Sequence, residues 1–234
     1  MQRYFVDNKD LILRDSDVHH IKNVMRMKIG EEIEIVNEKQ AYLARIDNLD
    51  PIKISIVRSI EEASELDIDI TIAIGLVKEQ KMDLILQKLT ELGVKKIIPI
   101  KMERSIINFD DKKKDKKLVR WESICKEASE QSHRLLIPEV TEPISLKELV
   151  KIEADVKIVA STKEVKNLIN NYLQTNKKCA KMVVVIGPEG GITDNEEEFL
   201  NNNGFVSVTL GKRILRVETA AIYIASVLNY QYMK

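Results

Sequence analysis

From residue 68 onward, patterns typical of buried strands alternate with patterns typical of amphipathic helices, and this alternation constrains the fold more than any other feature. Continuous, largely β-branched runs occupy residues 68–77, 95–100, 156–161, 181–187 and 206–211. Helical patterns follow them at residues 81–93, 116–131, 164–173, 193–204 and 218–232. Runs without polar alternation are typical of strands buried on both faces, so the pattern predicts an α/β fold with a parallel sheet.

The first 67 residues have a different period. Apolar and polar residues alternate in EEIEIVN, QAYLARI and KISIVRSI, which predicts three antiparallel strands of a small barrel or sheet. Before them, Ser16 is placed to cap a helix in SDVHHIKNVMRM. An acidic stretch near residue 61 interrupts the pattern. We therefore expect two domains, residues 1–67 and residues 68–234.

Composition excludes several classes of protein. Hydrophobic residues are 44% and charged residues 32% of the 234-residue chain, as in an ordered globular protein. No apolar run reaches the roughly 20 residues of a membrane-spanning helix, and the N-terminus lacks a secretory signal. Only Cys125 and Cys179 occur, widely spaced, so neither a disulfide framework nor a zinc site is expected. We expect a cytoplasmic protein without membrane contact or a bound metal.

Charge is balanced in total but not along the chain. The 37 basic and 37 acidic residues give a net charge of zero. Residues 95–134 hold 12 basic and 7 acidic side chains, an excess that could contact a polyanion such as RNA. A solvated lysine face explains the same excess equally simply, so both interpretations stay open.

Two loops at strand ends carry the functional information, because ligands bind outside the carboxyl ends of parallel strands. The first is GPEGG at 187–191, and the second is GKRILRVETA at 211–220. Neither has the spacing of a phosphate-binding loop. A glycine-rich turn is also a common connector, but the second loop carries apolar Ile214 and Leu215 where solvent exposure is expected. Apolar residues beside backbone amides suit a flat uncharged heterocycle such as adenine.

The strings IGPEGG, TLGKRILRVETAA, QKLTELGVKKIIPI, ERSI, EQSHR and HHIKNVMRMKIGEE occur in order over essentially the whole chain. With them the sequence resembles the bacterial 16S ribosomal RNA (uracil-N3)-methyltransferase family of the SPOUT superfamily. The resemblance implies a PUA-like RNA-binding β-barrel at the N-terminus and a SPOUT-type parallel sheet with a C-terminal trefoil knot. It further implies a homodimer that uses S-adenosyl-L-methionine to methylate a uridine of 16S rRNA or of the 30S subunit.

The resemblance also implies the site residues. The cofactor would be held by Ala160, Ser161, Thr162, Gly187, Pro188, Glu189, Gly190, Leu210, Gly211, Ile214, Leu215, Arg216 and Thr219. RNA would be contacted by Arg3, Arg26, Arg104 and Arg134. The wall formed by residues 160–162 has no distinctive motif, so its assignment depends on position alone.

Methylation at N3 requires alignment and either a base or cations that stabilise charge developing on the uracil ring. The candidate catalytic residues are Arg104, Arg134, Arg216 and Glu189. Glu130 and Glu218 are further carboxylates that could act as a base, and the base stays unassigned. Surface salt bridges for Arg104 and Arg134, and a helix-dipole contact for Glu218, are the structural alternatives.

Two other functions fit parts of the sequence. A ribose 2′-O-methyltransferase of the same superfamily is the nearest enzymatic alternative. In such enzymes the domain resembles one that starts with an Asn-x-Gly motif followed by Arg, whereas this chain has KEQKMDLILQKLTELG at that place. A noncatalytic RNA-binding protein of the same fold is the other alternative. The glycines present in both loops favour an enzyme that binds a cofactor.

Overall fold

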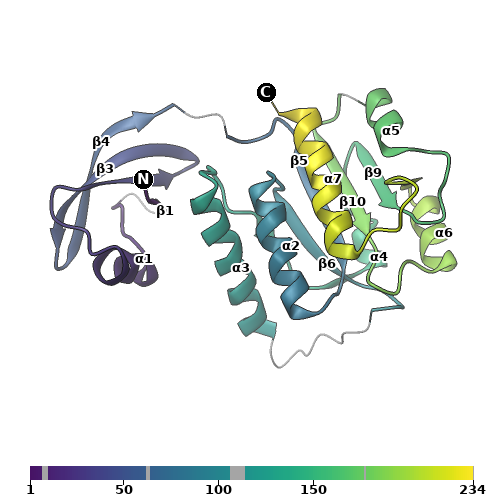
Figure 1. Cartoon of the computed structure of the whole chain (residues 1–234), viewed down its shortest axis with the longest axis horizontal. Helices are drawn as coiled ribbons and strands as arrows, with labels where there is room; N and C mark the ends of the chain where they lie inside the picture. The colour runs from purple at the N-terminus through teal and green to yellow at the C-terminus, as the bar shows by residue number, and fades with distance from the viewer. Residues whose placement is uncertain (7–9, 62–63, 106–113, 177, 234) are drawn as a thin grey trace. The chain divides into compact units, whose positions relative to one another are not determined.

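The structure is a computed structural model that describes residues 1–6, 10–61, 64–105, 114–176 and 178–233. The chain forms two compact units (Figure 1). Unit 1 comprises residues 1–65 and 126–137, and unit 2 comprises residues 66–125 and 138–234. Each unit has its own sheet and its own buried apolar residues, so each is described by itself.

Unit 1 is built on a four-stranded sheet in the order β1-β2-β3-β4. The strands are β1 (Arg3–Phe5), β2 (Glu32–Asn37), β3 (Gln40–Leu49) and β4 (Ile52–Ile60). The predicted antiparallel pairing of the last three strands is confirmed, while β1 pairs with β2 in parallel. Alternate residues of β2 and β3, such as Ile33, Ile35 and Ile46, are fully buried, which is the period-2 pattern that the sequence carries.

The helical segment of unit 1 begins two residues earlier than predicted. Helix α1 (Asp15–His19) continues into a π-helical turn, η1 (His20–Val24). Its N-cap is Arg14 and no side chain caps it, so the prediction that Ser16 is the cap was wrong. Ile21 is fully buried, and the ring nitrogen Nδ1 of His20 lies 2.9 Å from the hydroxyl of Tyr4. His20 therefore has a structural role.

Residues 126–137 are held in unit 1 by buried charged groups. The Lys126 ammonium donates to Asp17 at 2.5 Å and to Glu130 at 2.6 Å. Burial raises the pKa of Glu130, and Lys126 opposes that shift. Burial likewise raises the pKa of Tyr4 to about 12, with the charges of Glu130 and Asp17 adding to it. These contacts join the segment 126–137 to the first strand and helix of the unit.

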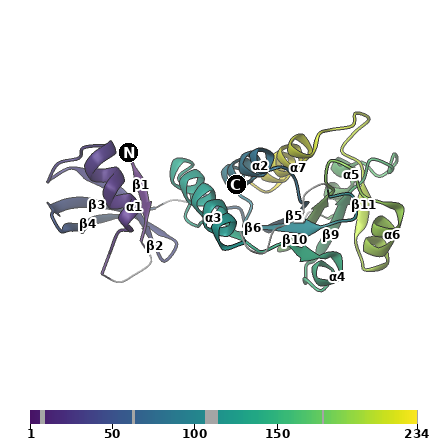
Figure 2. The same cartoon turned by 90° about the horizontal axis from the view of Figure 1, so that it is seen from below.

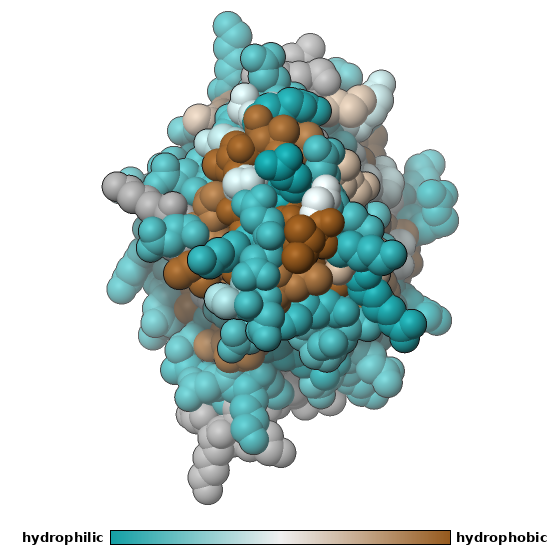
Figure 3. Space-filling view, turned by 90° about the vertical axis from the view of Figure 1, so that its left-hand side faces the viewer, coloured by the Kyte–Doolittle hydropathy of each residue, from teal (hydrophilic) through white to brown (hydrophobic). Residues whose placement is uncertain are grey.

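The surface of unit 1 is mixed in character. Figure 3 looks onto the side where unit 1 lies in Figure 1, and it shows apolar patches interrupted by hydrophilic side chains. The exposed large apolar residues of the unit are Met1, Ile12, Val24, Met25, Ile29, Ile56 and Val57.

Unit 2 contains a seven-stranded parallel sheet, as the alternation of strands and helices predicts. The order is β11-β9-β10-β5-β6-β7, and β8 also pairs with β6. The strands are β5 (Asp69–Gly75), β6 (Lys96–Lys101), β7 (Glu139–Val140), β8 (Ile144–Ser145), β9 (Val156–Ala160), β10 (Lys181–Ile186) and β11 (Val206–Val208). The helices are α2 (Glu79–Glu91), α3 (Lys114–Gln131), α4 (Leu146–Leu149), α5 (Ile169–Thr175), α6 (Asp194–Asn202) and α7 (Val217–Tyr232). The last residues of α3 belong to unit 1.

Helices cover both faces of this sheet. Helices α2 and α7 lie together on one face and α4 lies on the other (Figure 2). On the α4 face, Val183 and Val185 of β10 pack in one cluster with Leu149 of α4 and Leu200 of α6. Successive strand residues point to opposite faces. The central strands therefore contribute apolar side chains to both layers, which explains their unbroken apolar runs.

Several local predictions are confirmed and others are wrong. The capping box of Thr193 and Glu196 starts α6. Gly93 ends α2 with φ of +87°, a left-handed conformation that glycine tolerates best. The helix predicted over 164–173 forms only from Ile169, because residues 161–167 make a loop. Helix α3 begins at Lys114, two residues before the helix predicted over 116–131, and the lysines at 112 and 113 lie outside the described residues.

The last strand lies between two parts of one loop. Val208 of β11 pairs with Ala160 of β9 on one side. On its other side, the Thr209 N–H donates to the carbonyl of Asn167 at 2.9 Å, and the Ile169 N–H donates to the carbonyl of Thr209 at 3.1 Å. The segment 206–209 thus has hydrogen-bonded neighbours from both ends of the loop 161–168.

Candidate active site

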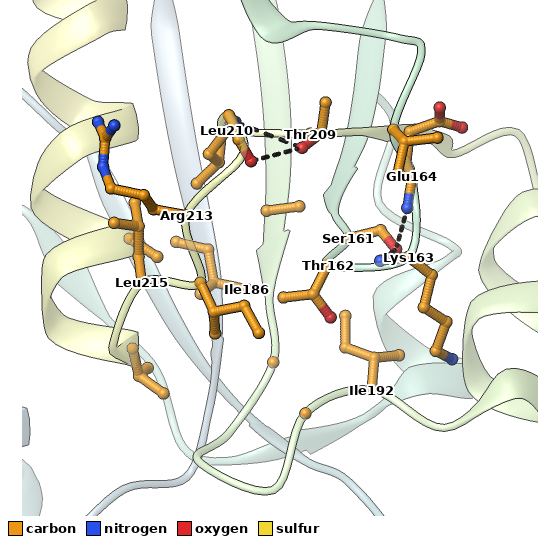
Figure 4. A pocket seen from close by; sticks show the side chains of 18 of the residues that line it. Ser161, Thr162, Lys163, Glu164, Ile186, Ile192, Thr209, Leu210, Arg213 and Leu215 are labelled. Atoms are coloured by element: carbon orange, nitrogen blue, oxygen red, sulfur yellow. Dashed lines mark hydrogen bonds between the residues drawn. The ribbon is translucent and has the colours of Figure 1, made fainter.

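A cavity of about 270 Å³ lies in unit 2 at the carboxyl ends of β9, β10 and β11. Figure 4 shows its walls, with Ser161 and Lys163 on one side, Leu210 and Leu215 on another, and Ile192 below. Three loops and the first turn of α7 form these walls. The cavity lies where parallel sheets bind ligands, because the strand ends leave the connecting loops free to surround a molecule.

The cavity is lined mainly by apolar groups and backbone. Ile214 is 86% exposed and lies among the lining residues, so its apolar side chain is available to a bound molecule. Gly191 and Gly211 have φ of +76° and +123°, and a Cβ at either position would meet nothing within 4 Å. Backbone conformation rather than space therefore requires glycine at both positions. Such walls suit a flat, uncharged ring system with a few polar edges.

A turn that follows β6 docks onto the first glycine loop. The Arg104 guanidinium donates to the carbonyl of Gly190 at 3.2 Å. The backbone N–H of Glu103 donates to Oε1 of Glu196 at 2.8 Å. Glu196 uses its other oxygen to accept from the backbone N–H of Thr193 at 2.9 Å, closing the capping box of α6. One carboxylate therefore fixes both the start of α6 and the turn that carries Arg104.

Lys81 of α2 links the two predicted loops. Its ammonium lies 2.7 Å from Oε1 of Glu189 and 3.5 Å from Oε2 of Glu218. The hydrogen bond to Glu189 is the main reason that the pKa of Lys81 is raised. Glu189 and Glu218 were candidates for a base, and both face this shared cation. Lys81 was not singled out in the sequence, because nothing in α2 indicates what its side chain meets.

Nine of the predicted cofactor residues line the cavity. They are Ala160, Ser161, Thr162, Gly187, Pro188, Leu210, Gly211, Ile214 and Leu215. The other four, Glu189, Gly190, Arg216 and Thr219, belong to the same loops or to the start of α7 but are not among its lining residues. Arg104 and Arg216 are exposed, and the docked turn brings Arg104 beside the glycine loop.

Two predicted RNA-contacting arginines are buried within unit 1. Arg3 is 2% exposed and donates to Glu34 at 2.7 Å and to the carbonyl of His133 at 2.8 Å. Arg134 is also 2% exposed and donates to Glu65 at 2.7 Å. Burial counts against direct contact with a ligand for both residues. Arg26, by contrast, is exposed, and its φ of +53° marks the end of the helical segment.

The sequence interpretation missed part of the site. Further residues that line the cavity are Lys163, Glu164, Val165, Leu168, Ile186, Gly191, Ile192, Glu197, Thr209, Lys212, Arg213, Val217 and Ala220. Many follow directly from the loops already predicted, so extending each loop would have found them. Gly75 was also missed. A Cβ there would lie 2.4 Å from the backbone nitrogen of Pro188, so β5 requires glycine where the first loop crosses it.

The described residues hold neither a group of metal ligands nor a membrane-spanning helix. There, His, Cys, Asp and Glu side chains nowhere form a group of three or more that could hold a metal ion. Within the same part of the chain, each helix is too short or too polar to span a membrane. The cavity at the strand ends is thus the site to which the predicted motifs lead.

Comparison with protein families gives two matches. The profile described as RNA methyltransferase domain matches residues 64–229. The profile described as RNA methyltransferase PUA domain matches residues 13–57. A relative from Bacillus subtilis, named ribosomal RNA small subunit methyltransferase E, is 36% identical, with 99% of this chain and 97% of the relative covered. One of the same name from Aquifex aeolicus is 33% identical, with 93% of each covered.

Solved structures match over the same length. A ribosomal RNA small subunit methyltransferase E from Neisseria gonorrhoeae, bound to S-adenosyl methionine, has a TM-score of 0.88 and 30% identity, covering 99% of this chain and 98% of that one. A Legionella pneumophila protein in complex with its bound cofactor SAM has a TM-score of 0.90 and 30% identity, covering 98% and 97%. Likeness therefore extends over both units.

Proposed function

Because the chain belongs to the ribosomal RNA small subunit methyltransferase E family, we propose that it transfers a methyl group from S-adenosylmethionine to N3 of a uridine in 16S rRNA. The observation that carries this proposal is the cavity at the ends of β9, β10 and β11, whose walls hold nine of the predicted cofactor residues. The solved relatives with bound S-adenosylmethionine support the same cofactor for this chain.

The walls of the cavity fit this cofactor. S-adenosylmethionine supplies a methyl group on a positively charged sulfur and presents a flat adenine. Ile214 and Leu215 offer apolar surface to such a ring, and the glycine loops bring backbone donors and acceptors to its edges. We assign binding to the lining residues of the three loops, with Glu189, Gly190, Arg216 and Thr219 as supporting members of the same segments.

The chemistry at uracil requires charge stabilisation. As the N3 proton leaves, negative charge develops over O2, N3 and O4, and a nearby cation lowers the energy of that state. We propose Arg104 for this role, because it is exposed and docked on the glycine loop beside the cavity. Arg216 at the N-terminus of α7 is the second candidate. Arg134 and Glu189 were also predicted to be catalytic, but each is engaged by an opposite charge, Glu65 and Lys81 respectively.

A pair of matched variants tests the docking of Arg104. Glu196→Ala removes the acceptor for Glu103 along with the Glu196 side-chain half of the capping box of α6, so the methyl-transfer rate should fall by about tenfold as Arg104 loses its fixed position. Glu148→Ala is the control, since Glu148 closes an equivalent capping box at Ser145 of α4. If single-turnover assays give the same methyl-transfer rate for both variants, Glu196 contributes only to the capping box of α6, and its bond to the turn that carries Arg104 does not affect the rate.

We also propose the trefoil knot that the resemblance implies. Its support is the position of residues 206–209, which hydrogen bond to β9 on one side and to residues 167–169 on the other. The chain then continues through 210–216 into α7. These neighbours from both ends of the loop 161–168 are the observation that supports the proposed knot.

We propose that residues 1–67 form a PUA-like domain that binds RNA and that residues 68–234 form the methyltransferase domain. We propose the cytoplasm as the location of the protein. The PUA-domain match over residues 13–57 supports the first assignment. Exposed Arg26 and Arg104 are the proposed RNA contacts. Arg3 contributes by holding residue 133 to the first sheet through its bonds to Glu34 and His133, and Arg134 contributes by holding Glu65.

A homodimer is proposed, with α7 as part of its interface. The apolar residues Ala221, Ile224, Ala225 and Leu228 of α7 are buried inside unit 2 and cannot form this interface. The helix instead exposes Tyr223 at 42% and Tyr230 at 75%, seven residues apart and so on one face. Exposed aromatic side chains at this spacing are typical of an interface.

Light scattering should give a mass of about twice the 26.9 kDa of one chain. Tyr223→Lys combined with Tyr230→Lys should reduce it to the monomer mass, because two charges would be buried without partners. Val119→Lys is the control, since Val119 is 66% exposed on α3. A native protein that stays monomeric at micromolar concentration would reject the proposed dimer.

The proposed reaction can be tested in cells. Ribosomal RNA from a strain that lacks this gene should lack one N3-methyluridine of 16S rRNA, detected by primer extension and mass spectrometry. Expression of the chain should restore it. A missing ribose methyl group instead would favour the 2′-O alternative, and an unchanged modification pattern would favour a noncatalytic protein.

A further inference from the structure

Lys81 of α2 pairs with a carboxylate from each of two segments that contribute walls to the cavity. Its ammonium faces Glu189 of the first glycine loop at 2.7 Å and Glu218 of the first turn of α7 at 3.5 Å. Neither carboxylate lines the cavity, but their chain neighbours Pro188 and Val217 do. One cation on α2 is thus bonded to two segments whose next residues form different walls of the same site.

The surroundings make this bridge sensitive to loss of the cation. The side chains of Glu189 and Glu218 are 21% and 16% exposed, and Lys81 is 32% exposed. Oε2 of Glu218 is buried without a hydrogen bond, so the ammonium 3.5 Å away is its compensating charge. Without Lys81, two carboxylates held close to the same point would repel each other in a partly dry environment.

Repulsion between the Glu189 and Glu218 carboxylates would push apart the two segments that carry them. The loop 187–191 is otherwise held by the docked turn at Arg104, and α7 is held by its packing on α2. Lys81 is therefore the group that sets the spacing between these segments directly. A ligand that contacts both walls binds best when that spacing is fixed beforehand, because it does not have to supply the ordering energy itself.

We infer that Lys81 is a positioning residue, whose ammonium joins the first glycine loop to the start of α7 and so holds the cavity at the width that S-adenosylmethionine needs. This inference rests on the proposed function, since it concerns the same cofactor. It assigns Glu189 and Glu218 to the bridge and thereby removes both from the candidates for a base.

The test compares three variants of the full chain by calorimetric titration with S-adenosylmethionine. Lys81→Met should weaken binding by about tenfold, as expected for loss of a partly buried ion pair. Lys81→Arg should restore most of the affinity. Lys88→Met is the matched control on the same helix, because Lys88 pairs at 2.8 Å with Glu91 and contacts neither loop; its binding should equal that of the native chain.

A second set of measurements separates positioning from simple loss of stability. At saturating cofactor, Lys81→Met should regain a kcat close to the native value while its KM for the cofactor stays raised. If this variant does not fold, Glu218→Gln keeps the shape and removes one charge of the bridge, and it should still weaken binding about threefold.

These measurements distinguish a failure of the proposed function from a failure of the inference about Lys81. A native chain that does not bind S-adenosylmethionine would overturn the proposed function. A native chain that binds it, together with a Lys81→Met variant of equal affinity or one that changes no more than Lys88→Met, would overturn this inference alone. Loss of kcat in Lys81→Met at unchanged KM would also contradict it, because that result would assign Lys81 to the chemical step.

Discussion

Replacing Gly190 with valine should raise the dissociation constant of S-adenosylmethionine by about 10- to 100-fold while the protein stays folded. A Cβ at residue 190 would lie 2.7 Å from Cβ of Arg104 and 2.9 Å from its carbonyl oxygen. Since the oxygen belongs to the backbone, the clash cannot be relieved by a rotamer change, and such overpacking costs about 1–3 kcal/mol. The turn that ends at Gly191, whose N–H donates to the carbonyl of Pro188, must therefore move.

Calorimetry and thermal unfolding together test this expectation. Gly190→Ala should show the same effect to a smaller degree. Ala180→Val is the control, because it adds a branched side chain at an exposed position near the other end of β10. If Gly190→Val binds the cofactor as tightly as the native chain, the loop 187–191 is not part of the cofactor site.

Arg134→Ala should act on stability and not on chemistry. The buried guanidinium holds Glu65 through two bonds, at 2.7 and 3.2 Å, and Glu65 also accepts from the backbone N–H of Leu135. Removing one partner of a buried ion pair leaves an uncompensated charge, so the free energy of unfolding should fall by about 3 kcal/mol. Urea unfolding followed by circular dichroism measures this loss.

Arg120→Ala is the matched control for Arg134→Ala. Arg120 makes a similar two-bond pair with Asp83, but it is 54% exposed, and exposed pairs contribute little to stability. The unfolding curve of this variant should match that of the native chain. A stable Arg134→Ala variant with a strongly reduced methyl-transfer rate would instead return Arg134 to the catalytic candidates.

The fold of unit 2 could be predicted because its pattern is local. Val183 and Val185 lie in a run that is apolar on both faces, and only a covered strand accommodates such a run. Residues 139–149 were missed, since β7 and β8 have two residues each and α4 has four. Elements that short carry too few residues to show a period.

The candidate site was likewise predictable only where its signal is local in the sequence. Glycine loops at strand ends are visible in the sequence, so most of the residues predicted to bind the cofactor line one cavity. The partners of charged side chains are not visible, because they come from distant parts of the chain. Arg3 pairs with Glu34, 31 residues away, and Arg134 with Glu65, 69 residues away. Nothing near either arginine indicates that it is buried.

Transfer of an isotopically labelled methyl group from S-adenosylmethionine to 30S subunits tests the central claim most directly. The subunits should come from a strain that lacks this gene, and the RNA should be digested and analysed by mass spectrometry. We predict a single labelled N3-methyluridine in 16S rRNA with the native chain and far less label with Gly190→Val. Label on a ribose oxygen, or no transfer by a native chain that binds the cofactor, would contradict the account.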